Sequence, residues 1–433
     1  MRLFSTLTLL LLMTDLRAQP ACDGAGRYAD SVFACVDVTP NIQYGTGLRD
    51  WSWNHLFCLN LQPPPYNTRL PLLFDFYAPC DDTVAQRPLV IVVHGGAWAA
   101  GNKADLAEFS QFLAKRGYAV ASVGYRLSLP SNPLCWDQDA DSVKLIRAAA
   151  RAIQDARAAV RFFRANAAEY RIDPDYIFIG GASAGGFTAL GVGYVDEDER
   201  PGACGPQPQY GNWFGHLNLP DMGSVEGDGG NPGFSSKVRG VINMSGALFK
   251  LDFMDGPQDP PLISFHGMAD NVVPFGYGCA LQNAIDLNIY HKCIKVYGAG
   301  AFQSYADSIG LESKLVAFPN GGHGYTAAEV IQLSENTVDF LCENLAKPVP
   351  VSEPGFAQVP VRIFPNPAGA MIQLQTPDPQ GLWRLYDATG RLVRSVAPQR
   401  SLTHIDRGDL PAGFYVWHWQ GRQNALSGTI VLN

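Results

Sequence analysis

The hydrophobic pattern along the central part of the chain alternates between continuous apolar runs and runs with helical spacing. The segment PLVIVVHGG (88–96) is apolar until it ends in glycines, which is typical of a strand buried on both faces. Further strands of this kind are predicted in five later runs: AVASVGY, DYIFIGG, KVRGVINMSG, PPLISFHG and SKLVAFP. Helices are predicted at 105–118, at about 141–170 and in the segment TAAEVIQLSENTVDFLCENLA. Strands that alternate with helices predict an α/β fold with a mostly parallel central sheet flanked by helices.

Other patterns mark the regions around this unit. Residues 19–87 contain short alternating runs such as LLFDFYAP, which predict antiparallel edge strands leading into the core. An insertion at about 196–236 is dominated by Gly, Pro and aromatic residues, and its length predicts a lid or a functional loop. A proline-rich linker is predicted at 347–360, and 361–433 alternates polar and apolar residues between glycine-containing turns. We therefore expect a catalytic domain at 19–346 and a small, sandwich-like all-β domain at 361–433.

Composition supports a folded chain of about two domains. The 433 residues are 47% hydrophobic and 17% charged, with a formal net charge of −8. Lys and Arg are scattered apart from a mild enrichment of Arg between 147 and 171, so no nucleic-acid partner is expected. This run of Arg is interpreted as the solvated face of the long helix.

The N-terminus has the order of features found in secretory signal peptides. Arg2 precedes a mostly apolar run at 3–13, and the small residue Ala18 precedes Gln19. We expect cleavage after Ala18, so that residues 1–18 are the signal peptide. The apolar run is too short to span a bilayer, and no integral membrane segment is expected after cleavage.

The nine cysteines suit an oxidising compartment, and none of them shows CxxC or CxxH metal spacing. No metal site is expected. Sequence does not define the connectivity, and the local pairs Cys22–Cys35, Cys58–Cys80 and Cys279–Cys293 are the first hypothesis. The odd number leaves at least one free thiol, for which Cys342 is the candidate because it falls on an apolar helix face.

The stretch FIGGASAGGF contains the pattern G-x-S-x-G at Gly181, Ser183 and Gly185. It follows a predicted strand and precedes a plausible helix. A tight turn in this context strains the serine backbone and exposes its hydroxyl at the edge of the sheet. Ser183 is therefore the candidate nucleophile, and a glycine turn that serves only packing is the alternative.

A serine nucleophile needs a base and an acid. His323 lies in the glycine-flanked loop FPNGGHGY after the last predicted strand of the α/β unit, where an imidazole can reach over the sheet edge. Asp270 follows the strand LISFHG and can fix the tautomer of that imidazole. Three other carboxylates, Asp252, Asp255 and Asp259, come before that strand, at its wrong end. The order Ser183, Asp270, His323 is the chain order expected for this fold.

The loop HGGAW at 94–98 follows the first buried parallel strand and can supply an oxyanion hole. Its small residues expose backbone amides, so Gly96 and Ala97 can converge with Ala184 on a developing negative charge. Trp98 is a candidate substrate-binding residue or a packing residue. Two further histidines, His94 and His266, are expected to orient these loops by hydrogen bonds.

Residues 60–346 resemble the α/β-hydrolase superfamily. They are most similar to carboxylesterases with an HGGxW-type oxyanion loop, related to the hormone-sensitive-lipase and feruloyl/acetyl-xylan esterase groups. The stretch NAAEYRIDPDYIFIGGASAGGFTAL resembles the helix, strand and nucleophile turn of those esterases. The resemblance implies that Ser183, Asp270 and His323 form the triad. The chain departs from the family in reading HGGAW rather than HGGG, and in an unusually long stretch between the acid and the base.

The last 73 residues resemble the C-terminal sorting domain of the type IX secretion system of Gram-negative bacteria. The match runs through FPNPAGAMIQLQ, LYDATGRLV, IDRGDLPAGFYVW and GTIVLN. It implies secretion or attachment to the cell surface through that machinery. A carbohydrate-binding β-module is the alternative interpretation.

These features together predict a secreted serine carboxylic-ester hydrolase that acts through an acyl-enzyme without a metal or organic cofactor. Secretion and the aromatic-rich insertion favour acetyl or feruloyl esters linked to carbohydrate, and a polyester would need the same machinery. One alternative is a serine exopeptidase of the prolyl-oligopeptidase type, because the loop HGMADNVVP also resembles that group. A non-catalytic surface binding protein is the other alternative.

Overall fold

The computed structural model describes most of the α/β unit and the strands of the C-terminal part. The described residues are Cys22, 26–48, 69–128, 142–212, 215–280, 293–347, 362–364, 371–375, 381–387, 391–398, 402–420 and 425–432. The expected signal peptide at 1–18 lies outside them, as does the expected linker at 347–360 apart from Lys347. Cys58 and Cys135 also lie outside them.

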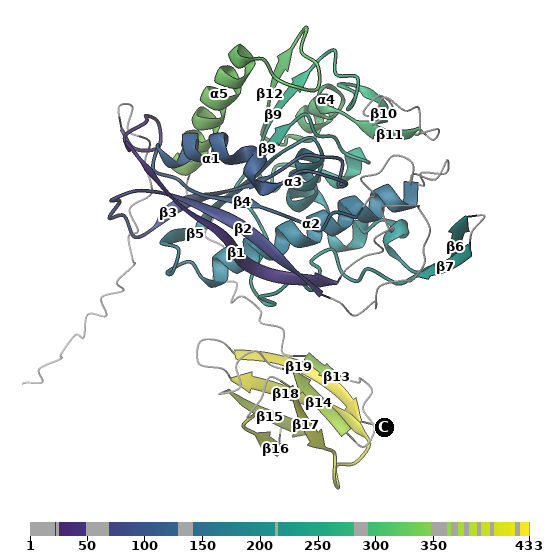
Figure 1. Cartoon of the computed structure of the whole chain (residues 1–433). Helices are drawn as coiled ribbons and strands as arrows, with labels where there is room; N and C mark the ends of the chain where they lie inside the picture. Colours follow the sequence, from purple (N-terminus) through teal and green to yellow (C-terminus); the bar gives the residue numbers. More distant parts are fainter. Residues whose placement is uncertain are drawn as a thin grey trace, which may run out of the picture.

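An eight-stranded sheet forms the centre of the α/β unit, in the order β1-β2-β4-β3-β5-β8-β9-β12 (Figure 1). Its strands are β1 (Val36–Leu48), β2 (Arg69–Pro79), β3 (Arg87–Val93), β4 (Ala119–Val123), β5 (Ile172–Ala182), β8 (Val241–Met244), β9 (Leu262–Gly267) and β12 (Ser313–Phe318). The pairs β1–β2 and β2–β4 are antiparallel, and the strands from β4 to β12 in this order pair in parallel. Both the antiparallel edge and the parallel core of the sequence prediction are confirmed.

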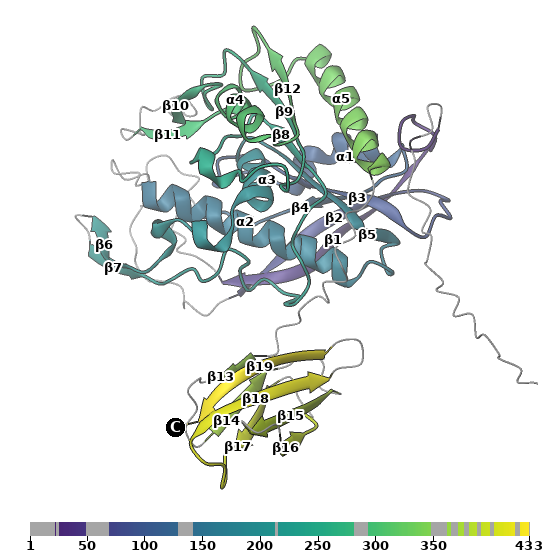
Figure 2. The ribbon, with the colours of Figure 1, turned by 180° about the vertical axis from the view of Figure 1, so that it is seen from behind.

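Helices cover both faces of this sheet. They are α1 (Ala107–Ala114), α2 (Ser142–Ala165), α3 (Ala184–Tyr194), α4 (Ala299–Ile309) and α5 (Ala327–Ala346). Strand β3 shows why its sequence is apolar throughout: Ile91 belongs to the buried cluster that contains residues of α2, α3 and α4, whereas Val90 and Val92 belong to the cluster that contains residues of α1 and α5. Figure 2 shows this division of the helices from behind.

Several elements were not predicted from the sequence. Short 3-10 helices occur at Lys103–Leu106, Glu197–Glu199, Gly202–Cys204 and Leu251–Phe253. The insertion contains the hairpin of β6 (Gln207–Asn212) and β7 (Gly215–Leu219). The long stretch between Asp270 and His323 contains the hairpin of β10 (Tyr277–Ala280) and β11 (Ile294–Tyr297), followed by α4. The extra length before His323 therefore builds a hairpin and a helix beside the parallel sheet.

The Arg-rich face of α2 is buried, so its interpretation as a solvated face was wrong. Arg147, for example, is only 4% exposed. Its guanidinium donates to the carbonyl oxygens of Ala203, Gly205 and Pro220 in the insertion. Further along the same helix, Arg161 donates to the Glu226 carboxylate. The arginines thus tie the described part of the insertion to α2, because each guanidinium offers five donors to backbone and carboxylate oxygens.

The disulfides correct most of the expected pairing. Cys22 pairs with Cys342 across 320 residues of sequence, and Cys35 pairs with Cys80. The expected bridge Cys279–Cys293 is confirmed and closes the β10–β11 hairpin. Cys342 is therefore not the free thiol. Among the described cysteines, the free one is Cys204, which is buried in the insertion.

The C-terminal part forms two antiparallel sheets around one core. Strands β13 (Arg362–Phe364), β14 (Met371–Gln375) and β17 (Leu402–Asp406) make the first sheet. Strands β15 (Leu382–Asp387), β16 (Leu392–Val396), β18 (Gly413–Gln420) and β19 (Ala425–Leu432) make the second. Leu374 from the first sheet and Trp383 and Trp419 from the second share one buried cluster. A small all-β unit was predicted here, and it is confirmed.

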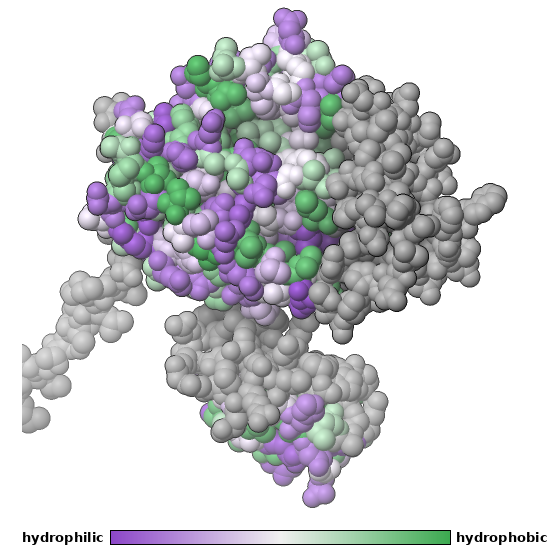
Figure 3. Space-filling model, in the orientation of Figure 1, coloured by the Kyte–Doolittle hydropathy of each residue, from purple (hydrophilic) through white to green (hydrophobic). Residues whose placement is uncertain are grey.

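The surface of the described part is mixed in character. Figure 3 shows hydrophilic and hydrophobic residues interleaved over one face of the α/β unit. Within the described ranges, no helix is long and apolar enough to cross a membrane.

Candidate active site

Ser183 occupies a strained turn between β5 and α3. Its backbone has φ 53° and ψ −119°, in a region that non-glycine residues rarely adopt. The Ser183 amide donates to the Met244 carbonyl oxygen at 2.8 Å, and its own carbonyl accepts from Phe187 at 3.0 Å. The turn is therefore held from β8 and from α3, which is the strand, turn and helix arrangement expected of a nucleophile.

The glycines around Ser183 allow close contacts of backbone with backbone. A Cβ atom on Gly185 would lie 2.0 Å from the Val93 carbonyl oxygen, and one on Gly181 would lie 2.2 Å from the Gly185 carbonyl oxygen. A Cβ on Gly186 would meet the Asn243 side chain at 2.7 Å. The start of α3 thus presses against both β3 and the end of β8, and only residues without a side chain fit there.

Ser183, His323 and Asp270 form one series of hydrogen bonds. His323 Nε2 lies 2.9 Å from Ser183 Oγ, and His323 Nδ1 lies 2.8 Å from Asp270 Oδ2. Asp270 follows the carboxyl end of β9, and His323 lies in the loop after β12. With Asp270 ionised, Nδ1 carries the ring proton and Nε2 can accept the proton of the serine hydroxyl. The three loops that the sequence singled out therefore meet at one edge of the sheet.

The Asp270 carboxylate is buried but well satisfied. Its Oδ1 accepts from the amides of Val272 and Val273 at 2.8 and 2.9 Å. Burial alone would raise the pKa of Asp270, but hydrogen bonds from His266, His323 and Val273 outweigh it and hold that pKa well below its usual range. Asp270 is accordingly an anion at neutral pH.

The rival carboxylates serve other parts of the fold. Asp259 Oδ2 accepts from the amides of Asp255 and Gly256 and closes a turn before β9. Asp252 lies in the 3-10 helix Leu251–Phe253. As predicted, all three carboxylates come before β9, at the opposite end of that strand from Asp270.

The HGGAW loop lies directly beside Ser183. A Cβ on Gly95 would come within 3.0 Å of the Ala182 carbonyl oxygen and 3.3 Å of Ser183 Cβ. Gly96, Ala97 and Trp98 all have positive φ, at 109°, 52° and 57°. This run of left-handed backbone turns the loop sharply at the end of β3. Ala184 is the first residue of α3, so the helix itself does not use its amide.

Two aromatic side chains, His94 and Tyr125, hold this loop in place. His94 is 2% exposed, stacks on Tyr125 with ring centroids 4.4 Å apart, and has Nδ1 2.7 Å from the Gly95 carbonyl oxygen. The Tyr125 hydroxyl donates to the carbonyl oxygens of His94 and Gly95. His94 thus orients the loop through hydrogen bonds.

Trp98 packs beneath the loop. It is 1% exposed, its indole N–H donates to Thr188 Oγ1 at 3.4 Å, and its ring meets Phe187 edge to face. Of the two roles considered for Trp98, the structure favours packing, because a side chain this buried offers almost no surface to a ligand.

The His323 loop has an anchor that the sequence did not reveal. The Tyr325 hydroxyl donates to the Phe265 carbonyl oxygen at 3.1 Å and lies 2.7 Å from Ser245 Oγ. Ser245 has a φ of 53° and follows β8. An aromatic residue two positions after the candidate base was the only available signal, and it does not specify a partner.

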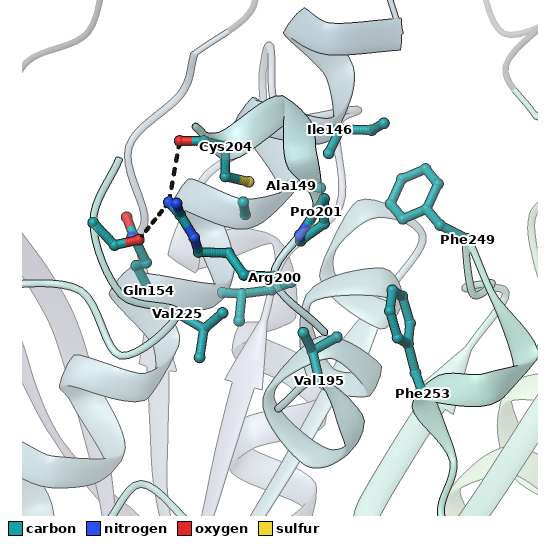
Figure 4. Close-up of a pocket in the computed structure, with 13 residues that line it drawn as sticks. Ile146, Ala149, Gln154, Val195, Arg200, Pro201, Cys204, Val225, Phe249 and Phe253 are labelled. Atoms are coloured by element: carbon teal, nitrogen blue, oxygen red, sulfur yellow. Dashed lines mark hydrogen bonds between the residues drawn. The ribbon is translucent and has the colours of Figure 1, made fainter. Parts of the chain in front are cut away.

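A separate apolar pocket lies outside α3 (Figure 4). It is bounded by α2, the insertion and the segment after β8. Phe249 in its wall also contacts Phe187, with ring centroids 5.7 Å apart. Ser183, Asp270 and His323 do not line it.

The described residues offer little for metal binding. Within them, one group of three potential ligands lies close enough together, formed by Cys35, Cys80 and Asp81. The sulfurs of Cys35 and Cys80 are joined in a disulfide, so they are not available as thiolate ligands.

Two family models match the chain. Residues 74–285 match the family described as BD-FAE, and residues 362–433 match the secretion system C-terminal sorting domain. The second match confirms the expected location, a secreted or cell-surface protein of a Gram-negative bacterium.

Curated relatives carry esterase names. A probable isoprenylcysteine alpha-carbonyl methylesterase from Oryza sativa subsp. japonica is 33% identical over 64% of this chain and 63% of its own length. A probable carboxylic ester hydrolase from Mycobacterium tuberculosis is 31% identical over 28% of this chain and 24% of its own length. The chain thus spans less than two thirds of the length of these relatives.

Solved esterases are among the structures to which this chain is similar. One is esterase 2 of Thermogutta terrifontis phosphorylated by paraoxon, at 22% identity and a TM-score of 0.45 over 64% of this chain and 92% of that one. Another is a truncated carbohydrate esterase from gut microbiota, at 22% identity and a TM-score of 0.44 over 74% and 99%. By sequence, residues 74–285 of this chain are thus similar to the family described as BD-FAE, and residues 362–433 are similar to the secretion system C-terminal sorting domain.

Proposed function

We propose that this protein is a secreted serine carboxylic-ester hydrolase that acts through an acyl-enzyme on Ser183. One observation carries the proposal: His323 bridges Ser183 Oγ and Asp270 Oδ2 at 2.9 and 2.8 Å. The esterase names of the curated relatives support it. The proposed substrates are acetyl or feruloyl esters linked to carbohydrate, or polyesters.

In the proposed mechanism, Ser183 Oγ attacks the ester carbonyl while His323 Nε2 takes its proton. Asp270 keeps the other ring proton on Nδ1 and stabilises the imidazolium that forms. The proton then passes to the leaving alcohol, and an acyl-enzyme remains. Water, activated by His323, attacks this ester and releases the acid.

The proposed oxyanion hole consists of the backbone amides of Gly96, Ala97 and Ala184. The contact of Gly95 with Ser183 supports it, because this contact keeps the loop next to the nucleophile. Loss of one such donor costs about 3 kcal/mol of transition-state stabilisation in other serine hydrolases. Trp98 is proposed to support the loop from beneath, without touching the substrate.

For the whole chain we propose a signal peptide at 1–18, a catalytic domain at 19–346, a linker at 347–360 and a sorting domain at 361–433. The type IX secretion machinery is the proposed partner of the last. The boundaries at 346 and 361 are supported by the end of α5 at Ala346 and the start of β13 at Arg362.

The test is hydrolysis of acetyl, butyryl, octanoyl and feruloyl esters by the purified protein and by S183A. We expect S183A to lose nearly all turnover and to resist labelling by a fluorophosphonate. The control is S308A, which alters an exposed serine on α4 and should keep full activity. Retention of more than a few per cent of activity in S183A would refute the mechanism.

The same panel separates the alternatives. Cleavage of aminoacyl-naphthylamides without ester hydrolysis would favour an exopeptidase. A wild-type protein that forms no adduct at Ser183 would favour a binding protein.

A further inference from the structure

A second histidine lies against the carboxylate of Asp270. His266 is the penultimate residue of β9, and its side chain is fully buried, like that of Asp270. His266 Nε2 lies 3.0 Å from the Val273 carbonyl oxygen and 3.4 Å from Asp270 Oδ2. The mechanism proposed above assigns no role to this imidazole.

The contacts of His266 define its tautomer. The amide of Ala299, the first residue of α4, donates to His266 Nδ1 at 3.4 Å. A nitrogen that accepts a hydrogen bond keeps its lone pair, so the single ring proton lies on Nε2. The Nε2–H group of His266 therefore faces Val273 and Asp270.

These contacts close a ring around the carboxylate. The Val273 amide donates to Asp270 Oδ1 at 2.9 Å, while the carbonyl of the same residue accepts from His266. The His266 N–H in turn faces Asp270 Oδ2, the oxygen that receives His323. A carboxylate can otherwise rotate easily about its terminal torsion. The ring fixes both oxygens with respect to β9.

We propose that His266 is a positioning residue, whose Nε2–H group fixes the Asp270 loop and keeps Oδ2 directed at His323. The inference rests on the proposed function. It assigns His266 no contact with the substrate and no proton transfer.

The charged and titratable groups around this network come from few elements. The loop after β9 contributes Asp270, and the loop after β12 contributes His323 and Tyr325. Among the described contacts, α4 presents the Ala299 amide to His266. The Phe275 ring meets the His266 ring edge to face, with ring centroids 5.7 Å apart. A change in the pH profile after substitution of His266 can thus be attributed to the Asp270–His323 pair.

Replacing His266 by Phe keeps a ring of similar size but removes the N–H donor. Oδ2 then has one N–H group fewer, so its negative charge stabilises the His323 imidazolium more strongly. The acid limb of the profile of kcat against pH should move up by at least about 0.5 pH units. We expect kcat of H266F to fall by about 10- to 100-fold, with KM for a short ester changed less than about twofold.

The matched variant is H266Q, whose side-chain amide can donate from nearly the same position. It should restore kcat to within about fivefold of the wild type and return the acid limb toward its original position. This pattern would support the proposal. Wild-type kcat in H266F, or a lower kcat with an unshifted acid limb, would overturn it, because a merely structural role lowers activity without moving the limb.

A measurement on the wild-type protein keeps the inference testable if H266F does not fold. Nitrogen-15 NMR of the full chain should show the proton of the neutral His266 ring on Nε2, because Nδ1 accepts from the Ala299 amide. A proton on Nδ1 would overturn the proposal. This result does not depend on activity, whereas a wild-type protein that hydrolyses no ester would count against the proposed function.

Discussion

The close approach of α3 to β3 makes Gly185, two residues after Ser183, intolerant of a side chain. In G185A the new Cβ would lie 2.0 Å from the Val93 carbonyl oxygen and 2.7 Å from that of His94. Real Cβ atoms essentially never come within 3.0 Å of such an atom, so α3 and β3 must separate by about 1 Å. Both partners are backbone, and a rotamer change cannot relieve the contact.

The separation acts first on catalysis. Ser183 is the cap of α3, so a shift of the helix moves Oγ away from His323 Nε2, now 2.9 Å distant. A misplacement of about 1 Å can cost about 100-fold in rate, and we expect a loss of that size in kcat/KM. Overpacking should cost about 1–3 kcal/mol of stability and lower the melting temperature by about 2–4 °C per kcal/mol.

The assay combines hydrolysis of a short aryl ester with thermal melting and fluorophosphonate labelling. The matched control is G202A, where a new Cβ meets nothing within 4 Å and both activity and stability should stay unchanged. Circular dichroism establishes that G185A is folded. If folded G185A keeps more than a third of the wild-type kcat/KM, the argument that this glycine sets the position of Ser183 fails.

The remaining predictions concern Asp270, the long disulfide and the insertion. D270N should lower kcat by about 10⁴-fold without unfolding the protein, because Asn favours the wrong tautomer of His323; a loss below tenfold in stopped ester assays would argue against the triad. The low pKa of Asp270 contributes stability that is complete above its unfolded value of 3.8 and is lost as pH falls through the lower folded value. The melting-temperature gap between wild type and D270N should hence be constant above about pH 5 and shrink below about pH 4, and a gap that widens in acid would contradict this sign. The double variant C22S/C342S should lose about 2–5 kcal/mol in urea titrations yet keep its activity at 25 °C, whereas unchanged stability would show that this bridge constrains little. R147M should speed hydrogen exchange at 202–205 and leave Ser183 labelling unchanged; equal exchange would mean that the buried arginine does not hold the insertion.

The sequence allowed the three triad residues to be predicted, but not the contacts that hold them in place. Ser183, Asp270 and His323 follow strand ends, and in a parallel sheet those ends share one edge, so their meeting was predictable. His266 was expected only to orient a loop. Its partners, Val273 and Ala299, are backbone groups that any residue would offer, and α4 itself was not predicted.

Two errors have the same physical origin. The arginines of α2 recur at helical spacing, a pattern that indicates one helix face but not what covers it. Here the cover is a set of carbonyl groups, such as that of Pro220, which leave no mark in the side-chain sequence. Cys342 was misjudged for a related reason, since its partner Cys22 lies 320 residues away and local spacing cannot reveal it.

The bridge between Cys22 and Cys342 makes the α/β unit a covalent circle. A single cut by a protease anywhere between these two residues opens the circle but leaves both fragments attached. The sorting domain, at 362–433, lies beyond the point of closure. Its removal after export would therefore shorten the molecule without opening the circle. The two ends of the fold that carries Ser183, Asp270 and His323 would remain joined by the disulfide.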